Sequence, residues 1–167
     1  MDCEQLRLRV RERNLSRCEA QPLLPGVETL LHEARDLGLR AAVASSSSAG
    51  WVEGWLSRHR IRRLLDCVCA RDDVRQVKPA PDLFLLAAAR LGVAAATCLV
   101  FEDSPNGIRA AQAAGMLCVA IPNPVTRPLP LPDPDLVLDS AGALPLRAIA
   151  SRLGLALPAP GRAELSP

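Results

Sequence analysis

The sequence predicts an α/β protein built on a parallel, doubly wound sheet. Short, continuous apolar runs alternate along the chain with segments whose apolar residues recur at helical spacing. This alternation is typical of strands that helices cover on both faces, because neither face of such a strand meets water. The 167 residues suffice for one substantial core, and 49% hydrophobic with 23% charged residues is a globular composition.

Helical spacing and apolar runs predict the elements of the first half of the domain. Apolar residues recur at helical spacing from Val27 to Leu37, and Gly38 then ends the helix. The run at 39–44 ends in four serines and is a predicted buried strand. The segment 50–60 carries both tryptophans on one helical face. Residues 66–70 form the second predicted strand.

Helix start and stop signals organise the second half. Pro81 opens a helix at its first turn, where a missing N–H costs nothing, and that helix ends before Gly92. Ser104 is a predicted N-cap, Pro105 follows it, and the helix runs to Gly115. The remaining elements are predicted strands at 98–101, 117–121 and 135–138, a proline-rich loop at 122–134 and a closing helix at 144–153.

Composition excludes several classes of function. A formal net charge of +2 with only 2% aromatic residues argues against a general nucleic-acid binder. Four alternating arginines from Arg7 to Arg13 are interrupted by Glu12, which favours a solvated helix face over a polyanion contact. No apolar run approaches the roughly 20 residues of a membrane span, and no secretory signal is visible. We therefore expect a cytoplasmic protein without membrane or nucleic-acid partners.

The six cysteines do not indicate a metal site. No Cys-x-x-Cys pair occurs and the chain has only two histidines, so reduced and mostly buried thiols are expected. Cys3–Arg9 and Cys69–Arg75 match the Cys-x5-Arg spacing of thiolate phosphatases, but neither segment holds the glycines that let backbone amides surround a phosphate. Asp133-Pro134-Asp135 has Asp-x-Asp spacing, yet it leaves a proline loop and enters a strand, which disfavours it as a nucleophile.

Polar residues follow three of the predicted strands. Ser45-Ser46-Ser47-Ser48 follow the strand at 39–44, Lys78 lies in the loop after 66–70, and Glu102-Asp103 follow the strand at 98–101. Ligands bind outside the carboxyl ends of the strands in open parallel sheets, so these groups are expected to converge. Each feature alone is an ordinary loop, helix cap or helix start. Their order, each at a strand end, favours a binding site.

These residue types match the demands of phosphoryl transfer. Charge spreads over the non-bridging oxygens of the transferred group, so a protein supplies hydrogen-bond donors and cations. The Ser45 hydroxyl and the Ser46 N–H can donate, and Lys78 brings a positive charge on a backbone that Pro79 biases away from helix. Asp103 can hold Mg²⁺, which typically keeps several waters, and Glu102 is a candidate direct ligand or neighbour of the ligand.

At these residues the sequence resembles the haloacid dehalogenase (HAD) superfamily, in the branch of β-phosphoglucomutase and sugar-phosphate phosphatases, over residues 22–153. The resemblance implies a HAD core in which Ser45 is the phosphate-binding hydroxyl, Lys78 neutralises phosphate and nucleophile, and Asp103 binds Mg²⁺ beside Glu102. Ser47 and Ser48 lie near the position where some relatives bind a second substrate phosphate. The segments that carry the resemblance are Pro25-Gly26-Val27, Ala44 to Ser47, Lys78 to Asp82, Val100 to Ser104, Gly107 and Ala113 to Met116.

One departure from the family is large. The family's first motif, a strand ending in an Asp-x-Asp-Gly-Thr-like segment, supplies the attacking aspartate, and the chain has no counterpart. In the family topology that strand lies between those ending at Ser45 and Asp103, so the core is expected to be incomplete at its N-terminal side. The expected organisation is a remnant of a helical cap or linker at 1–21, a core at 22–155 and a flexible tail at 156–167.

Two functional hypotheses follow. The first is an Mg²⁺-dependent phosphatase or phosphomutase lineage that acts on a small phosphorylated metabolite, such as a sugar phosphate, through an aspartyl-phosphate. The 167-residue chain alone is then expected to be inactive, as a fragment without the nucleophile. The second is a truncated, non-catalytic homologue that binds phosphate or a protein partner. A generic α/β binding domain unrelated to the superfamily is a third, weaker reading.

Overall fold

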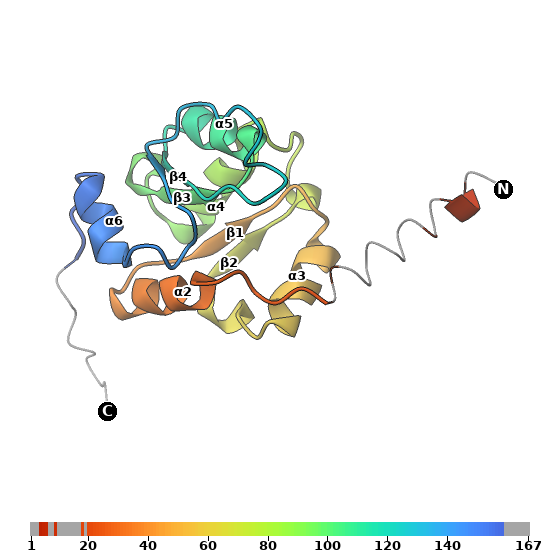
Figure 1. Ribbon diagram of the computed structural model, residues 1–167, viewed down its shortest axis with the longest axis horizontal. Helices are drawn as coiled ribbons and strands as arrows, with labels where there is room; N and C mark the ends of the chain where they lie inside the picture. Colours follow the sequence, from red (N-terminus) through yellow and green to blue (C-terminus); the bar gives the residue numbers. More distant parts are fainter. Residues whose placement is uncertain (1–3, 7–8, 10–17, 19, 159–167) are drawn as a thin grey trace.

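The structure, a computed structural model, describes residues 4–6, 9, 18 and 20–158 (Figure 1). Helices and strands alternate along it, as predicted. The helices are α2 (Val27–Asp36), α3 (Ala49–Arg58), α4 (Asp82–Leu91), α5 (Pro105–Ala113) and α6 (Leu146–Arg152), and the strands are β1 (Ala42–Ala44), β2 (Cys67–Cys69), β3 (Leu99–Glu102), β4 (Leu117–Ala120) and β5 (Leu136–Val137).

The five strands are all parallel, but they form two sheets. β1 pairs with β2 in the register Ala44↔Cys69, and β3, β4 and β5 pair in that order, with Glu102 opposite Ala120. Among the described residues no strand pairs with the second edge of β1 or of β3. The prediction of a parallel α/β fold is confirmed, and its sheet is divided between β1 and β3.

Alternating side chains build one core on each face of the strands. Ala42, Ala44 and the β2 cysteines pack with α4, while Val100 of β3 and Cys118 of β4 pack with α4 and α5. On the other face, Val43 packs with α2 and α3, and Val119 packs with α6. This period of two is the signature of strands buried on both faces. In Figure 1, α5 lies above the strands and α2 and α3 lie below them.

Two helices join the two sheets across the division. Phe84 of α4 packs with Val100 of β3, while Leu83 of the same helix packs with Cys69 of β2. On the opposite face, α2 contributes to two clusters, with Leu31 in the one that also holds Val43 of β1 and Leu30 in the one around Val119 of β4. The facing strands are nevertheless less protected than β4: all three residues of β1 are half-buried, whereas Cys118, Val119 and Ala120 are fully buried. Pairing on one side only accounts for this difference.

Several predicted boundaries shift by one to three residues. The strand expected at 39–44 begins only at Ala42, because the Ala41 N–H donates to the Asp66 carboxylate (2.7 Å) instead of to a strand. Pro81 precedes α4 as its N-cap instead of opening it. β3 includes Glu102, which the sequence placed after the strand. Ser104 is the predicted N-cap of α5: its Oγ accepts from the Gly107 N–H (3.1 Å).

A close backbone approach fixes one end of the fold. Gly26, with φ of 87°, precedes α2, and a Cβ at this position would lie 2.0 Å from the backbone nitrogen of Gly142. Only glycine fits both the conformation and the space. The Leu146 N–H donates to Glu33 (2.6 Å), which ties the start of α6 to α2.

The two segments predicted for the chain ends lie largely outside the described residues: the cap remnant at 1–21 and the tail at 156–167 stay predictions. Over the part of the chain that the structure describes, no helix combines the length and the apolar character needed to cross a bilayer. The described cysteines are free thiols. Cys69 and Cys118 are buried as expected, whereas Cys67 and Cys98 are only half-buried.

Candidate active site

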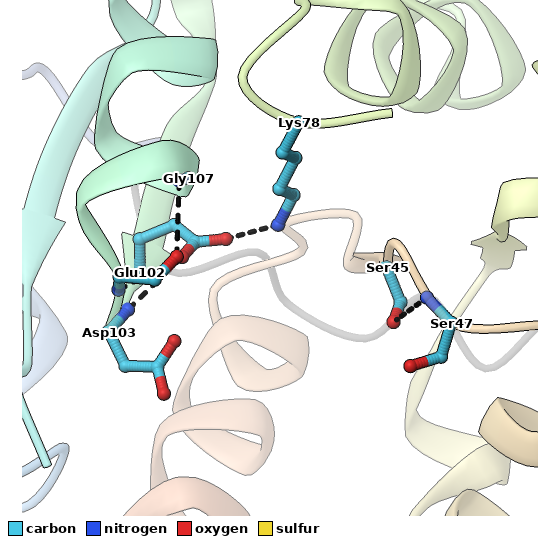
Figure 2. Close-up of polar contacts among 7 residues, drawn as sticks. Ser45, Ser47, Lys78, Glu102, Asp103 and Gly107 are labelled. Carbon is cyan, nitrogen blue, oxygen red and sulfur yellow. Dashed lines mark hydrogen bonds and ion pairs between the residues drawn. The ribbon is translucent and has the colours of Figure 1, made fainter. Parts of the chain in front are cut away.

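The predicted residues lie at the carboxyl ends of the parallel strands. Ser45 follows β1, Lys78 lies in the loop between β2 and α4, Glu102 ends β3 and Asp103 follows it. Figure 2 shows Lys78 reaching Glu102, with Asp103 next to Glu102 and with Ser45 and Ser47 on a separate loop. Lys78, Glu102 and Asp103 therefore form one cluster, and within the described chain no hydrogen bond joins the serine loop to it.

Lys78 and Glu102 form a buried ion pair. The Lys78 Nζ bonds to Glu102 Oε1, and the two side chains are only 12% and 7% exposed. The same Nζ lies 4.5 Å from the centre of the Phe84 ring, a cation–π contact that shields it further from water. Lys78 precedes Pro79 through a cis peptide bond. A charge in such a place is retained because its partner is present, since a lone buried charge is very costly.

The second carboxylate oxygen of Glu102 is also occupied. Glu102 Oε2 accepts from the Ser104 hydroxyl (3.1 Å) and from the backbone N–H groups of Asp103 (3.2 Å) and Ser104 (3.4 Å). Gly107 makes room for this carboxylate, because a Cβ at Gly107 would lie 1.9 Å from Oε2. With both oxygens engaged, Glu102 serves in this arrangement to hold Lys78 and the start of α5.

Asp103 is exposed and is held by one oxygen. Its Oδ2 accepts from the Asn123 Nδ2 (2.7 Å), and no other hydrogen bond to its carboxylate is found within the described residues. Oδ1 is therefore available to a ligand. Asn123 is missing from the residues predicted from the sequence, although its position in the loop after a fourth parallel strand was a signal for it.

The serine loop presents a hydroxyl with a proton to donate. The Ser45 N–H donates to Cys69 O (2.9 Å), which extends the pairing of β1 with β2, and Ser45 Oγ accepts from the Ser47 N–H (3.2 Å). The Ser47 carbonyl accepts from the Arg71 N–H (2.9 Å), which fixes the loop from the other side. Among the described residues Ser45 Oγ acts only as an acceptor, so its own proton is available to an anion.

The other two serines contribute less. Ser46 is exposed, and Ser48 lies at the N-cap position of α3 without a side-chain cap bond. The first helical N–H, that of Ala49, is satisfied by Asp72 (2.7 Å) instead. The Ser48 side chain therefore does not cap α3, and its hydroxyl remains available to a ligand.

The structure describes two of the alternative nucleophiles, Cys69 and Asp135, whereas Cys3 lies outside the described residues. Cys69 is fully buried, and burial raises the pKa of its thiol to about 11, so a thiolate is not present at neutral pH. Asp135 accepts from the Cys118 N–H (2.7 Å) and so holds the entry to β5 against β4. Among the described residues no cluster of three or more His, Cys, Asp or Glu side chains is arranged as a metal site. Within the described residues, Asp103 is the carboxylate next to the Lys78–Glu102 pair that keeps a free oxygen.

The order of the site residues agrees with a known family. The family model described as haloacid dehalogenase-like hydrolase matches residues 2–121, which include the serine loop, Lys78, Glu102 and Asp103. The chain belongs to this family. The resemblance predicted from the sequence is confirmed, and so is the HAD-type fold.

Relatives within the family include named phosphatases. The Bacillus subtilis (strain 168) protein YhcW, whose name assigns it provisionally to the phosphatases, is 46% identical over 143 residues, 86% of this chain and 65% of YhcW. Fructose-1-phosphate phosphatase YqaB of Escherichia coli (strain K12) is 41% identical over 112 residues, 67% of this chain and 57% of YqaB.

One HAD-family crystal structure was solved with a sugar bisphosphate. It is a mutant of CbbY from Rhodobacter sphaeroides in complex with xylulose-(1,5)bisphosphate, and it matches with a TM-score of 0.69 and 37% identity. The match covers 74% of this chain and 56% of that one. This chain thus spans between 56% and 65% of the length of CbbY, YqaB and YhcW.

Proposed function

We propose that the chain carries most of an Mg²⁺-dependent phosphoryl-transfer site for a small phosphorylated metabolite, such as a sugar phosphate, and that it acts in a phosphatase or phosphomutase through an aspartyl-phosphate. The observation that carries the proposal is the buried Lys78–Glu102 pair beside the free Asp103 oxygen, at the strand edge that also presents Ser45. The name of YqaB, a fructose-1-phosphate phosphatase, and the xylulose-(1,5)bisphosphate bound to the CbbY mutant support this substrate class.

Each residue has a distinct role in the proposed site. The Ser45 hydroxyl and the Ser46 N–H donate to the non-bridging phosphate oxygens, with Ser47 and Ser48 as candidates for a second phosphate. Lys78 supplies a positive charge to the transferred group, and Glu102 fixes its ammonium in place. A charge already positioned before substrate arrives stabilises developing negative charge without reorganisation.

Asp103 is the residue that would hold Mg²⁺. Its exposed carboxylate keeps one free oxygen, which suits a cation that uses one or two carboxylates and retains water. Glu102 could join it only by releasing Lys78, so we assign Glu102 as the neighbour of the ligand. When bound, Mg²⁺ would supply charge stabilisation at the phosphoryl oxygens.

In the proposed site the attacking aspartate would come from another segment. No strand occupies the division between β1 and β3 in the described residues, and Ser45 and Asp103 follow these two strands directly. We propose that the 167-residue chain by itself does not turn over phosphate esters. The same observation favours the second candidate, a non-catalytic homologue that binds phosphate or a protein partner. The DNA upstream of Met1 separates the two candidates. An in-frame Asp-x-Asp-Gly segment after an apolar run would favour the phosphoryl-transfer enzyme, and the absence of such a segment would favour the non-catalytic homologue.

Titration with inorganic phosphate tests the phosphate site in the chain as it exists. In ¹⁵N–¹H NMR spectra the amide signals of Ser45 and Ser46 should move with saturation, and Ser45→Ala and Lys78→Met should each weaken binding several-fold. Gln76→Ala, in the exposed loop before Lys78, is the matched control and should bind as the wild type does. Equal binding in all four proteins would remove the serine loop and Lys78 from the site.

The cytoplasmic setting and the core boundaries at 22–155 are also part of the proposal. Cell fractionation tests the first, and limited proteolysis tests the second.

A further inference from the structure

Asn123 connects the loop after β4 to Asp103. β3 and β4 run in parallel register to their last residues, and the pairing continues when the Ile121 N–H donates to Glu102 O (2.7 Å). The chain then turns so that Asn123 Nδ2 donates to Asp103 Oδ2 (2.7 Å). Two neighbouring parallel strands thus deliver an amide and a carboxylate to the same point of the sheet edge.

The Asn123 side chain is itself fixed by its own loop. Its Oδ1 accepts from the backbone N–H groups of Val125 (2.8 Å) and Thr126 (3.1 Å). The Thr126 Oγ1 in turn accepts from the Asn123 N–H (3.0 Å). Because two donors face the amide oxygen, the amide nitrogen must face Asp103. The direction of this hydrogen bond is therefore set by the loop.

We infer that Asn123 is a positioning residue for Asp103, one that orients its carboxylate for a divalent cation; the inference rests on the proposed metal role of Asp103. An exposed aspartate otherwise samples several rotamers, and a bond to Oδ2 restricts them while leaving Oδ1 free. A neutral donor suits this task, because a lysine or arginine there would cancel the charge that attracts the cation. Hydrogen-bond partners of ligating carboxylates commonly have this effect on metal affinity.

Paramagnetic NMR on the full chain tests the inference without relying on activity. Mn²⁺ is titrated into ¹⁵N-labelled protein, and broadening of the amide signals of Asp103 and Ser104 reports its binding. Asn123→Ser keeps an oxygen that can accept from the loop N–H groups but cannot reach Asp103. Val125→Ala is the matched control, because it shortens an exposed side chain of the same loop and keeps the backbone N–H that donates to Asn123 Oδ1. Asp103→Asn removes the proposed ligand.

The expected result is that Asn123→Ser raises the apparent Kd for Mn²⁺ by about 10-fold, that Val125→Ala binds as the wild type does, and that Asp103→Asn abolishes local broadening. Equal losses in both loop variants, or no loss in Asn123→Ser, would overturn the positioning role while leaving Asp103 as the ligand. Unchanged broadening in Asp103→Asn would instead refute the proposed metal site. The side-chain amide signal of Asn123 should also move in Asp103→Asn, a readout that needs no substitution at Asn123; an unmoved signal would refute the hydrogen bond.

Discussion

Gly107→Ala should destabilise the protein although it improves a helix. Gly107 lies in the first turn of α5, where a new Cβ would lie 1.9 Å from Glu102 Oε2 and 2.0 Å from the carboxylate carbon. Both carbon and oxygen must move, and the carboxylate then loses its place opposite Lys78. Because the ion pair is mostly buried, at 12% and 7% exposure, its loss leaves a charge in a poorly solvated place.

The magnitude follows from two opposing terms. Breaking a buried pair costs about 3–5 kcal/mol, and replacing a helical glycine by alanine gains up to about 1 kcal/mol. The expected net loss in the free energy of unfolding is about 2–4 kcal/mol. Gly54→Ala is the matched control, since Gly54 lies in α3 where, outside the helix's own backbone, no described atom lies within 4 Å of a new Cβ, and it should stabilise by up to about 1 kcal/mol.

Urea unfolding monitored by circular dichroism measures both variants. The decisive comparison repeats Gly107→Ala in a Glu102→Ala background, where no carboxylate obstructs the new methyl group. There the substitution should be neutral or stabilising, which gives a coupling energy of about 2 kcal/mol or more between the two sites. If Gly107→Ala is as stable as the wild type, or costs the same in both backgrounds, the role given to Gly107 is wrong.

Three further predictions concern the core and the two facing strand edges. Lys78→Met keeps the apolar stem but leaves Glu102 without a counter-ion, so the free energy of unfolding should fall by about 3 kcal/mol; an unchanged urea midpoint would mean that the pair contributes nothing. Heating the chain alone should give a transition below about 60 °C, or aggregation, because within the described residues β1 and β3 each leave one edge unpaired; a reversible, monomeric transition above that temperature contradicts it. Alkylation at pH 8, read by peptide mass spectrometry, should leave Cys69 and Cys118 unmodified in the folded chain, because burial raises the pKa of their thiols to about 11 and about 12. Their reactive thiolate forms only as the pH approaches these values, so rapid modification at pH 8 would show that they are not buried.

The sequence predicts the fold well wherever the signal is local. The Ser104 cap, the glycine after α4 and the apolar runs of β3 and β4 place the second half to within a residue or two. β1 is misplaced because its start depends on Asp66, a side chain 25 residues away that accepts from the Ala41 N–H. Contacts of that kind leave no trace in periodicity or propensity.

The site is predicted in its residue types and only partly in its contacts. The strand-end rule selects Ser45, Lys78 and Asp103, and the structure places each of them after a parallel strand, while their roles stay predictions. It does not say that Glu102 belongs to the strand and turns toward Lys78, since that depends on the space left by Gly107. The rule also does not predict Asn123, because this residue lies in a proline-rich loop whose conformation is set by its own turn and not by the strand pattern.

The most direct test of the account is phosphate release from p-nitrophenyl phosphate with Mg²⁺. Two proteins are compared: the 167-residue chain, and the same chain extended at its N-terminus with the corresponding segment of YqaB. We expect no turnover by the 167-residue chain. The extended protein should show turnover, and Asp103→Asn should abolish it. Turnover by the 167-residue chain that Asp103→Asn abolishes would place the attacking group within it. A folded but inactive extended protein would contradict the claim that Ser45, Lys78 and Asp103 form a phosphoryl-transfer site.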